Sequence, residues 1–179
     1  MSTPPADMLS ELAKWNNGKG IDLVSWGGCS GDFRLAIGYS TIFWPRFVLF
    51  DDYIFREGFT AESVRGFEAQ HKCDKGSVEA VVNHLHIADI QYHGCEDITE
   101  QRVVFLGRIL KEIYTAKLAW QFPDRPCEIS FYEPDDRTDL MGFQITFWQK
   151  KHVEPGALNG SPATMLGNSG VTDGPPSVS

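Results

Sequence analysis

Residues 97–121, DITEQRVVFLGRILKEIYTAKLAWQ, decide how this chain folds. Apolar side chains recur there at spacings of three and four residues, which is the period of an α-helix with one buried face. Asp97 and Glu100 form a D-x-x-E pair typical of a helix start, and Pro123 prevents continuation far beyond the stretch. We therefore expect one long helix at about 98–121, whose inward stripe consists of Val103, Leu106, Ile109, Leu110, Ile113, Tyr114 and Trp120.

Two alternating runs follow this helix. Residues 127–132 and 143–148 place apolar and polar side chains in turn, which is the period of a β-strand with one buried face. An acidic turn at 133–139 separates them, so we expect an antiparallel hairpin. Tyr132 and Trp148 would then lie on the face opposite the core, as candidate binding residues.

Upstream of the long helix the apolar spacing is again helical. Residues 61–70 form one predicted helix, which Thr60 caps. A second predicted helix starts at Ser77 and carries an apolar stripe from Val78 to Leu85.

The first fifty residues favour strands. A short amphipathic helix is expected over 7–17, because Asn16-Asn17-Gly18 would stop it. Residues 21–26, 33–39 and 47–50 then read as strands, the middle one from strict alternation.

Strands gathered at both ends of the chain, instead of alternating with helices, favour an α+β fold. We expect a mostly antiparallel sheet of about four to five strands, with helices packed on one face, in one domain over 7–152. Residues 1–6 are expected to be disordered. Gly, Pro, Ser and Asn make up 15 of the last 26 residues, so 153–179 is predicted to be a flexible tail with too little apolar surface to fold.

The formal net charge of −8 and the pI of about 5.0 argue against nucleic acid and anionic membrane surfaces as partners, and favour a basic protein. No apolar run approaches the ~20 residues of a membrane span, and the first residues lack the pattern of a signal peptide. The four cysteines, far apart in sequence, are then expected to be reduced thiols in the cytoplasm.

Gly27-x-Cys29-x-Gly31 matches the G-x-C-x-G form of a nucleophile elbow. In such an elbow the glycines allow a strained turn that exposes the nucleophile. An elbow must lead into a helix, however, and the alternation over 33–39 predicts a strand. Cys29 is therefore a catalytic candidate whose predicted surroundings do not match the motif.

His84-x-His86 followed by Asp89 is typical of metallohydrolase loops. On a strand both imidazoles would share one face, but on a helix residues two apart point about 200° apart and cannot share a metal ion. Because the apolar stripe predicts a helix here, we expect the two histidines to be bystanders. Glu79, Asn83 and His86 would share one flank of that helix.

Two further doublets, His71-x-Cys73 and His93-x-Cys95, together supply two imidazoles and two thiolates, a complete set of zinc ligands. Structural zinc sites usually separate the members of a pair by two to four residues, so two unconnected loop doublets are the simpler interpretation.

Lys117 falls within the apolar stripe of the long helix. A buried lysine can act as a base or a Schiff-base nucleophile, whereas a lysine with a packed stem and an exposed ammonium group is structural. We favour the structural role.

Taken together, these patterns predict a non-catalytic cytosolic binding protein, of inhibitor or immunity type, with an acidic surface that meets a basic protein partner or a second copy. No cofactor is expected. The alternative is a small hydrolase or zinc-dependent enzyme that uses Cys29 or the His84–His93 region.

Overall fold

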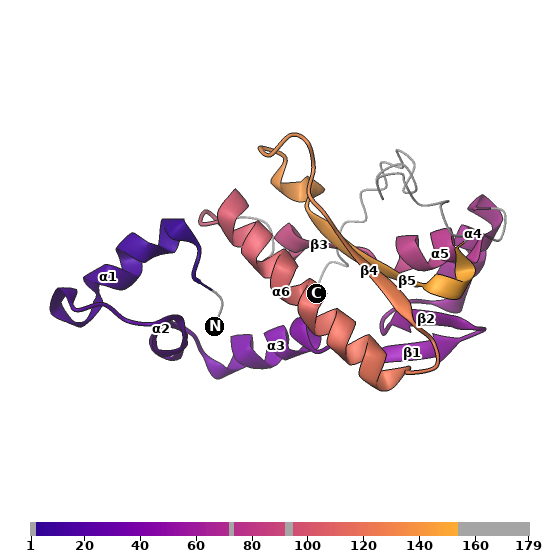
Figure 1. Ribbon diagram of the computed structural model, residues 1–179, viewed down its shortest axis with the longest axis horizontal. Helices are drawn as coiled ribbons and strands as arrows, with labels where there is room; N and C mark the ends of the chain where they lie inside the picture. The colour runs from indigo at the N-terminus through magenta and orange to yellow at the C-terminus, as the bar shows by residue number, and fades with distance from the viewer. Residues whose placement is uncertain (1–2, 72–73, 92–94, 154–179) are drawn as a thin grey trace, which may run out of the picture.

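Figure 1 shows the computed structural model, which describes residues 3–71, 74–91 and 95–153. Within these residues the chain has the predicted α+β fold, with six α-helices and two small antiparallel sheets. The predicted tail, 153–179, lies outside the described residues apart from Val153, as do Met1 and Ser2. Of the predicted disordered start, Pro5 is buried.

The long helix is confirmed as α6, Glu100–Gln121, and its N-terminal cap is Thr99. The Thr99 hydroxyl accepts a hydrogen bond from the backbone N–H of Arg102 at 3.3 Å. The predicted D-x-x-E cap is therefore wrong by two residues. Asp97 instead accepts a charged hydrogen bond from the Arg102 guanidinium at 2.8 Å.

The hairpin after α6 is also confirmed. Strands β4 (Cys127–Tyr132) and β5 (Gln144–Gln149) pair antiparallel, with Ile129 opposite Phe147. The short strand β3 (Leu85–His86) pairs with the other edge of β5, which gives the order β3-β5-β4.

Strands β1 (Phe47–Phe50) and β2 (Tyr53–Arg56) form a separate two-stranded sheet. The prediction of one sheet with four to five strands is therefore wrong. Asp51 and Asp52 join the two strands with φ of 46° and 74°. Two consecutive left-handed residues give a tight hairpin turn whose twist matches that of its strands, so β1 and β2 pair locally.

Strand β5 is the centre of the fold, and every one of its residues is buried. Ile145 and Phe147 pack against α6 within the main hydrophobic cluster. On the other face the Thr146 hydroxyl donates to the carbonyl of Ala80, in α5 (Lys75–Val82), at 2.6 Å. Helices thus cover both faces of the sheet instead of the one predicted, which is why Trp148 is only 7% exposed.

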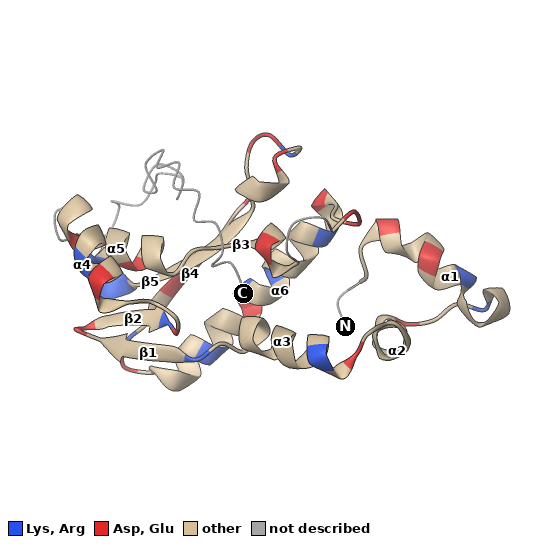
Figure 2. Cartoon of the chain, turned by 180° about the vertical axis from the view of Figure 1, so that it is seen from behind, with Lys and Arg blue, Asp and Glu red and all other residues tan. Residues whose placement is uncertain are grey.

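The first two predicted strands are wrong, because residues 21–26 and 33–39 lie in or next to helices. An N-terminal arm consists of α1 (Leu9–Gly18), α2 (Leu23–Ser30) and α3 (Phe33–Phe43). Asp22 and Asp32 cap α2 and α3 by accepting from the backbone N–H of Ser25 and Leu35. The arm extends away from the sheets, and α2 and α3 carry one charged residue, Arg34 (Figures 1 and 2).

The remaining helices follow the sequence closely. The predicted helix over 7–17 corresponds to α1 and the short 3-10 turn Ala6–Met8, and it ends at left-handed Asn16 and Asn17. Helix α4 (Ala61–Gln70) has the predicted Thr60 cap. Helix α5 is capped by Asp74 instead of Ser77. Short 3-10 turns complete the fold at Ile87–Ile90, Leu140–Gly142 and Lys150–His152.

Candidate functional site

Cys29 is exposed and lies in the last turn of α2, on the N-terminal arm. Gly27 and Gly28 are helical residues in the same element. A nucleophile elbow needs its nucleophile on a turn between a strand and a helix, so the surroundings of Cys29 differ from that motif. Figure 1 places α2 apart from β3, which carries His86.

The structure brings His84 and His86 together, and the prediction of a helix there is wrong. Helix α5 ends at Val82, and the chain enters β3 at Leu85. The two imidazole rings lie 5.3 Å apart between centroids, at an interplanar angle of 89°. Burial lowers the pKa of His84, and the nearby His86 acts in the same direction.

The zinc hypothesis for the two H-x-C doublets involves Cys73 and His93, which lie outside the described residues. His71 is the C-cap of α4. The Cys95 thiol donates to the Asp97 carboxylate at 2.7 Å, which raises the pKa of the thiol. Among the residues that the structure describes, no group of three or more His, Cys, Asp or Glu is arranged to hold a metal ion.

Lys117 is buried, with 6% of its surface exposed. Its ammonium group donates to the carbonyl of Trp44 at 3.2 Å and lies 4.6 Å from the centre of the Trp44 ring. Burial lowers the pKa of this ammonium group. These contacts tie α6 to the segment that leads into β1, so they give Lys117 a structural role.

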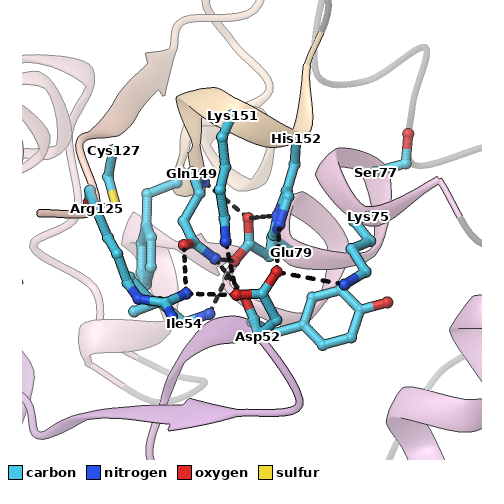
Figure 3. Close-up of polar contacts among 12 residues, drawn as sticks. Asp52, Ile54, Lys75, Ser77, Glu79, Arg125, Cys127, Gln149, Lys151 and His152 are labelled. Atoms are coloured by element: carbon cyan, nitrogen blue, oxygen red, sulfur yellow. Dashed lines mark hydrogen bonds and ion pairs between the residues drawn. The ribbon is translucent and has the colours of Figure 1, made fainter.

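The most extensive polar cluster is one that the sequence did not reveal (Figure 3). At its centre the Glu79 carboxylate, which has no exposed surface, accepts four hydrogen bonds. The donors are the Ile54 backbone N–H at 2.8 Å, the Gln149 backbone N–H at 2.7 Å, the Gln149 side-chain amide at 2.6 Å and the His152 Nδ1 at 3.0 Å. We call this set the Glu79 network.

Asp52 extends the network toward the surface (Figure 3). Its carboxylate accepts from Arg125 and Lys151 at 2.6 Å each and lies 3.5 Å from the Nε2 of His152. These partners hold the pKa of Asp52 well below its usual value, Lys151 having the largest effect. The network thus joins the β1–β2 turn, α5 and the end of β5.

A buried carboxylate beside an imidazole can serve as a general base, but here its oxygen atoms are already in use. A carboxylate has about four lone-pair directions, and the described contacts of Glu79 fill four. Since no accepting capacity is left for a substrate or a metal ion, we interpret the Glu79 network as structural.

A cavity of about 640 Å³ lies between the arm and the body of the protein. Its walls include Trp26, Tyr39 and Phe43 of the arm, together with Val103 and Leu106 of α6. Burial, with the nearby Cys95 and Asp97, raises the pKa of the Tyr39 hydroxyl.

The outer side of the arm exposes large apolar side chains. Phe33, Ile37 and Trp44 are 89%, 68% and 54% exposed; Phe33 and Ile37, four residues apart, share one side of α3, and Trp44 is the C-cap of that helix. Trp120 of α6 is 73% exposed, and its ring lies 6.4 Å from that of Trp44. We call these four residues the α3 stripe.

The opposite side of α3 is apolar as well. Ile42 and Phe43 pack against the main hydrophobic cluster, and Tyr39 and Phe43 line the cavity. No residue of α3 is buried, even though two opposite sides of the helix are apolar. The helix therefore has the composition of a covered element.

Comparisons with protein-family models, with curated proteins and with solved structures find no match to this chain. In the described ranges, no helix combines the length and the apolar character that crossing a bilayer requires.

We predict that Cys29, which is exposed, reacts with iodoacetamide in the folded protein about tenfold or more faster than Cys127, which is partly buried. Burial, with the nearby Glu79, raises the pKa of the Cys127 thiol to about 12, so little of it is present as the reactive thiolate at neutral pH. Peptide mass mapping over time would measure both rates. In urea the two rates should converge, and equal rates in the folded protein would contradict the partly buried position of Cys127.

Proposed function

We propose that this chain is a non-catalytic interaction protein that binds another polypeptide through the α3 stripe. The observation that carries the proposal is the exposure of Phe33, Ile37, Trp44 and Trp120 along α3 and the adjacent end of α6, where the rings of Trp44 and Trp120 lie next to each other. Contiguous exposed apolar patches of this kind mark interaction sites more often than isolated apolar residues do.

The size of the stripe supports this proposal. With about 150–250 Å² for each aromatic side chain, its four residues expose on the order of 600 Å² of mostly apolar surface. A stable interface buries roughly 800 Å² per partner, including a polar rim. The α3 stripe therefore supplies most of the area of one such interface, and it includes two tryptophans, the residue type most enriched among energetically dominant contacts.

The net charge of the protein favours one kind of partner. With a net charge of −8, the chain attracts a basic protein at long range and repels a second copy of itself. We therefore propose a basic protein with an apolar patch as the occupant of the stripe. An inhibitor or immunity protein, which covers the functional surface of a basic partner, has this chemistry.

The proposal predicts that a photo-reactive phenylalanine at Ile37 cross-links one defined basic protein in cells, whereas the same residue at Glu62, exposed on α4, does not. The complex reconstituted from purified proteins should lose about thirtyfold or more in affinity with Ile37→Asp, because truncating a central contact costs roughly 2 kcal/mol or more. Thermal unfolding should stay unchanged, since the Ile37 side chain is mostly exposed.

Two results would overturn this function. Cross-links from Ile37 to a second copy of the chain, with a dimer in sedimentation that Ile37→Asp dissociates, would assign the stripe to self-association. If no cross-link is specific to Ile37, no partner binds the α3 stripe, and the proposed function is wrong.

A further inference from the structure

His84, just before β3, and His86, within β3, form a site that is independent of the α3 stripe. His84 Nδ1 lies 2.5 Å from the carbonyl oxygen of Val81, and His86 Nδ1 lies 2.6 Å from the carbonyl oxygen of Met141. A carbonyl oxygen can only accept, so each Nδ1 carries the hydrogen. In the neutral imidazole the lone pair is then on Nε2, and metal-binding histidines are oriented by this kind of Nδ1–H contact.

The separation of the rings fits one shared metal ion. Two imidazoles bound through Nε2 at roughly 2.1 Å to a tetrahedral zinc ion place their ring centroids about 5.2 Å apart. The observed distance between the centroids of His84 and His86 is 5.3 Å. The separation of the ring centroids therefore matches that of two imidazoles sharing a single ion.

The surrounding backbone holds this arrangement in place. The side-chain amide of Asn83, which caps α5, donates to the carbonyls of Ile54 and Phe147 at 2.9 and 3.2 Å. The chain therefore leaves α5 at Asn83 and runs extended. His86 is paired opposite Gln144, and the next residue, Ile87, donates to the carbonyl of Phe143 at 2.9 Å. In an extended segment, residues two apart point to the same side.

We propose that His84 and His86 bind one Zn²⁺ ion through their Nε2 atoms. Imidazole is a preferred ligand of zinc, and the described residues supply no third side chain in a ready-made group. The remaining coordination positions of the zinc ion are open to water or to a ligand with an oxygen or nitrogen donor. The site is thus of the open kind, in contrast to the four-ligand sites that stabilise zinc folds.

Titration of the full chain with Co²⁺, followed by visible absorption, and with Zn²⁺, followed by calorimetry, tests this proposal. We expect one ion per chain. His84→Asn and His86→Asn should each weaken binding by about tenfold or more, because each removes one of two protein ligands. The matched control is His71→Asn, which changes a histidine of α4 and should leave the affinity unchanged. Circular dichroism of each variant verifies that it is folded.

These variants distinguish zinc binding at His84 and His86 from zinc binding at the H-x-C doublets. The titrations also test the metal site independently of the proposed function. A loss of binding in His71→Asn, with His84→Asn unaffected, would place the ion at the H-x-C doublets and overturn the proposal. Absence of stoichiometric binding by the wild-type chain would overturn it as well. Neither result bears on the α3 stripe, because the assay contains no protein partner.

Discussion

Replacing Glu79 with alanine should lower the free energy of unfolding by about 3–5 kcal/mol, since it removes a buried charged partner and leaves its donors unsatisfied. The backbone N–H groups of Ile54 and Gln149 both donate to this carboxylate, and both residues have no exposed surface. Urea unfolding at neutral pH, followed by circular dichroism, would measure the change.

Two further variants show whether the loss comes from the Glu79 network. Glu79→Gln keeps the shape of the side chain but replaces one accepting oxygen with a donor, so we expect a smaller loss of about 1–3 kcal/mol. Glu112→Ala removes an exposed carboxylate from α6 and should change stability by less than about 0.5 kcal/mol. Similar stabilities for Glu79→Ala and Glu112→Ala would mean that the network contributes little.

Gly107→Ala should destabilise the protein by about 1–3 kcal/mol, although alanine is by itself the better helix former. Gly107 lies in the middle of α6, where the ring of Phe131 packs directly against its backbone. A Cβ atom at this position would overlap three atoms of that ring. Either the Phe131 ring or the packing of α6 against β4 must then shift, and thermal unfolding should report the change.

The matched control is Gly66→Ala in α4. Nothing lies within 4 Å of a Cβ atom there, so the substitution should raise the free energy of unfolding by about 0.5–1 kcal/mol. Opposite signs for the two glycine variants are the expected outcome. Two stabilising substitutions would show that α6 and β4 are packed less closely than the structure indicates.

The elements that the sequence predicted correctly are those with a regular apolar period or a clear cap. Helix α6 and the β4–β5 hairpin each have a regular apolar period, and α4 has its threonine cap. The start of α6 was misplaced because Asp97 and Thr99 both suit a cap, and only the fold shows that Thr99 caps the helix while Asp97 pairs with Arg102.

Within the arm, α2 and α3 were predicted incorrectly as strands, and for α3 the reason is that it is apolar on two sides. Phe33 and Ile37 point outward while Tyr39 and Phe43 line the cavity, and together they imitate the alternation of a strand. A signal for the helices was present. Asp22 and Asp32 each stand where an N-cap would, and each does cap a helix.

The Glu79 network could not be found by spacing, because its members are distant in sequence. Glu79 lies 25 residues from Ile54 and 70 from Gln149. Sequence analysis placed Glu79 and Asn83 on a shared flank of a helix, but no local pattern shows that this flank is buried. From the sequence, His84 and His86 would share one face only if the chain were extended there. Helix α5 ends at Val82, before the two histidines, and their imidazole rings lie close together.

The position of β5 has a consequence for how the protein is made. The central strand is also the last strand among the described residues, so β3, α5 and α6 all emerge from the ribosome before the element that joins them. Until β5 has been synthesised as far as Gln149, the surfaces of α5 and α6 that pack against this strand stay exposed in the nascent chain. The body must then fold in one late, cooperative step. Before that step the incomplete chain is prone to aggregation and depends on the ribosome and on chaperones for protection.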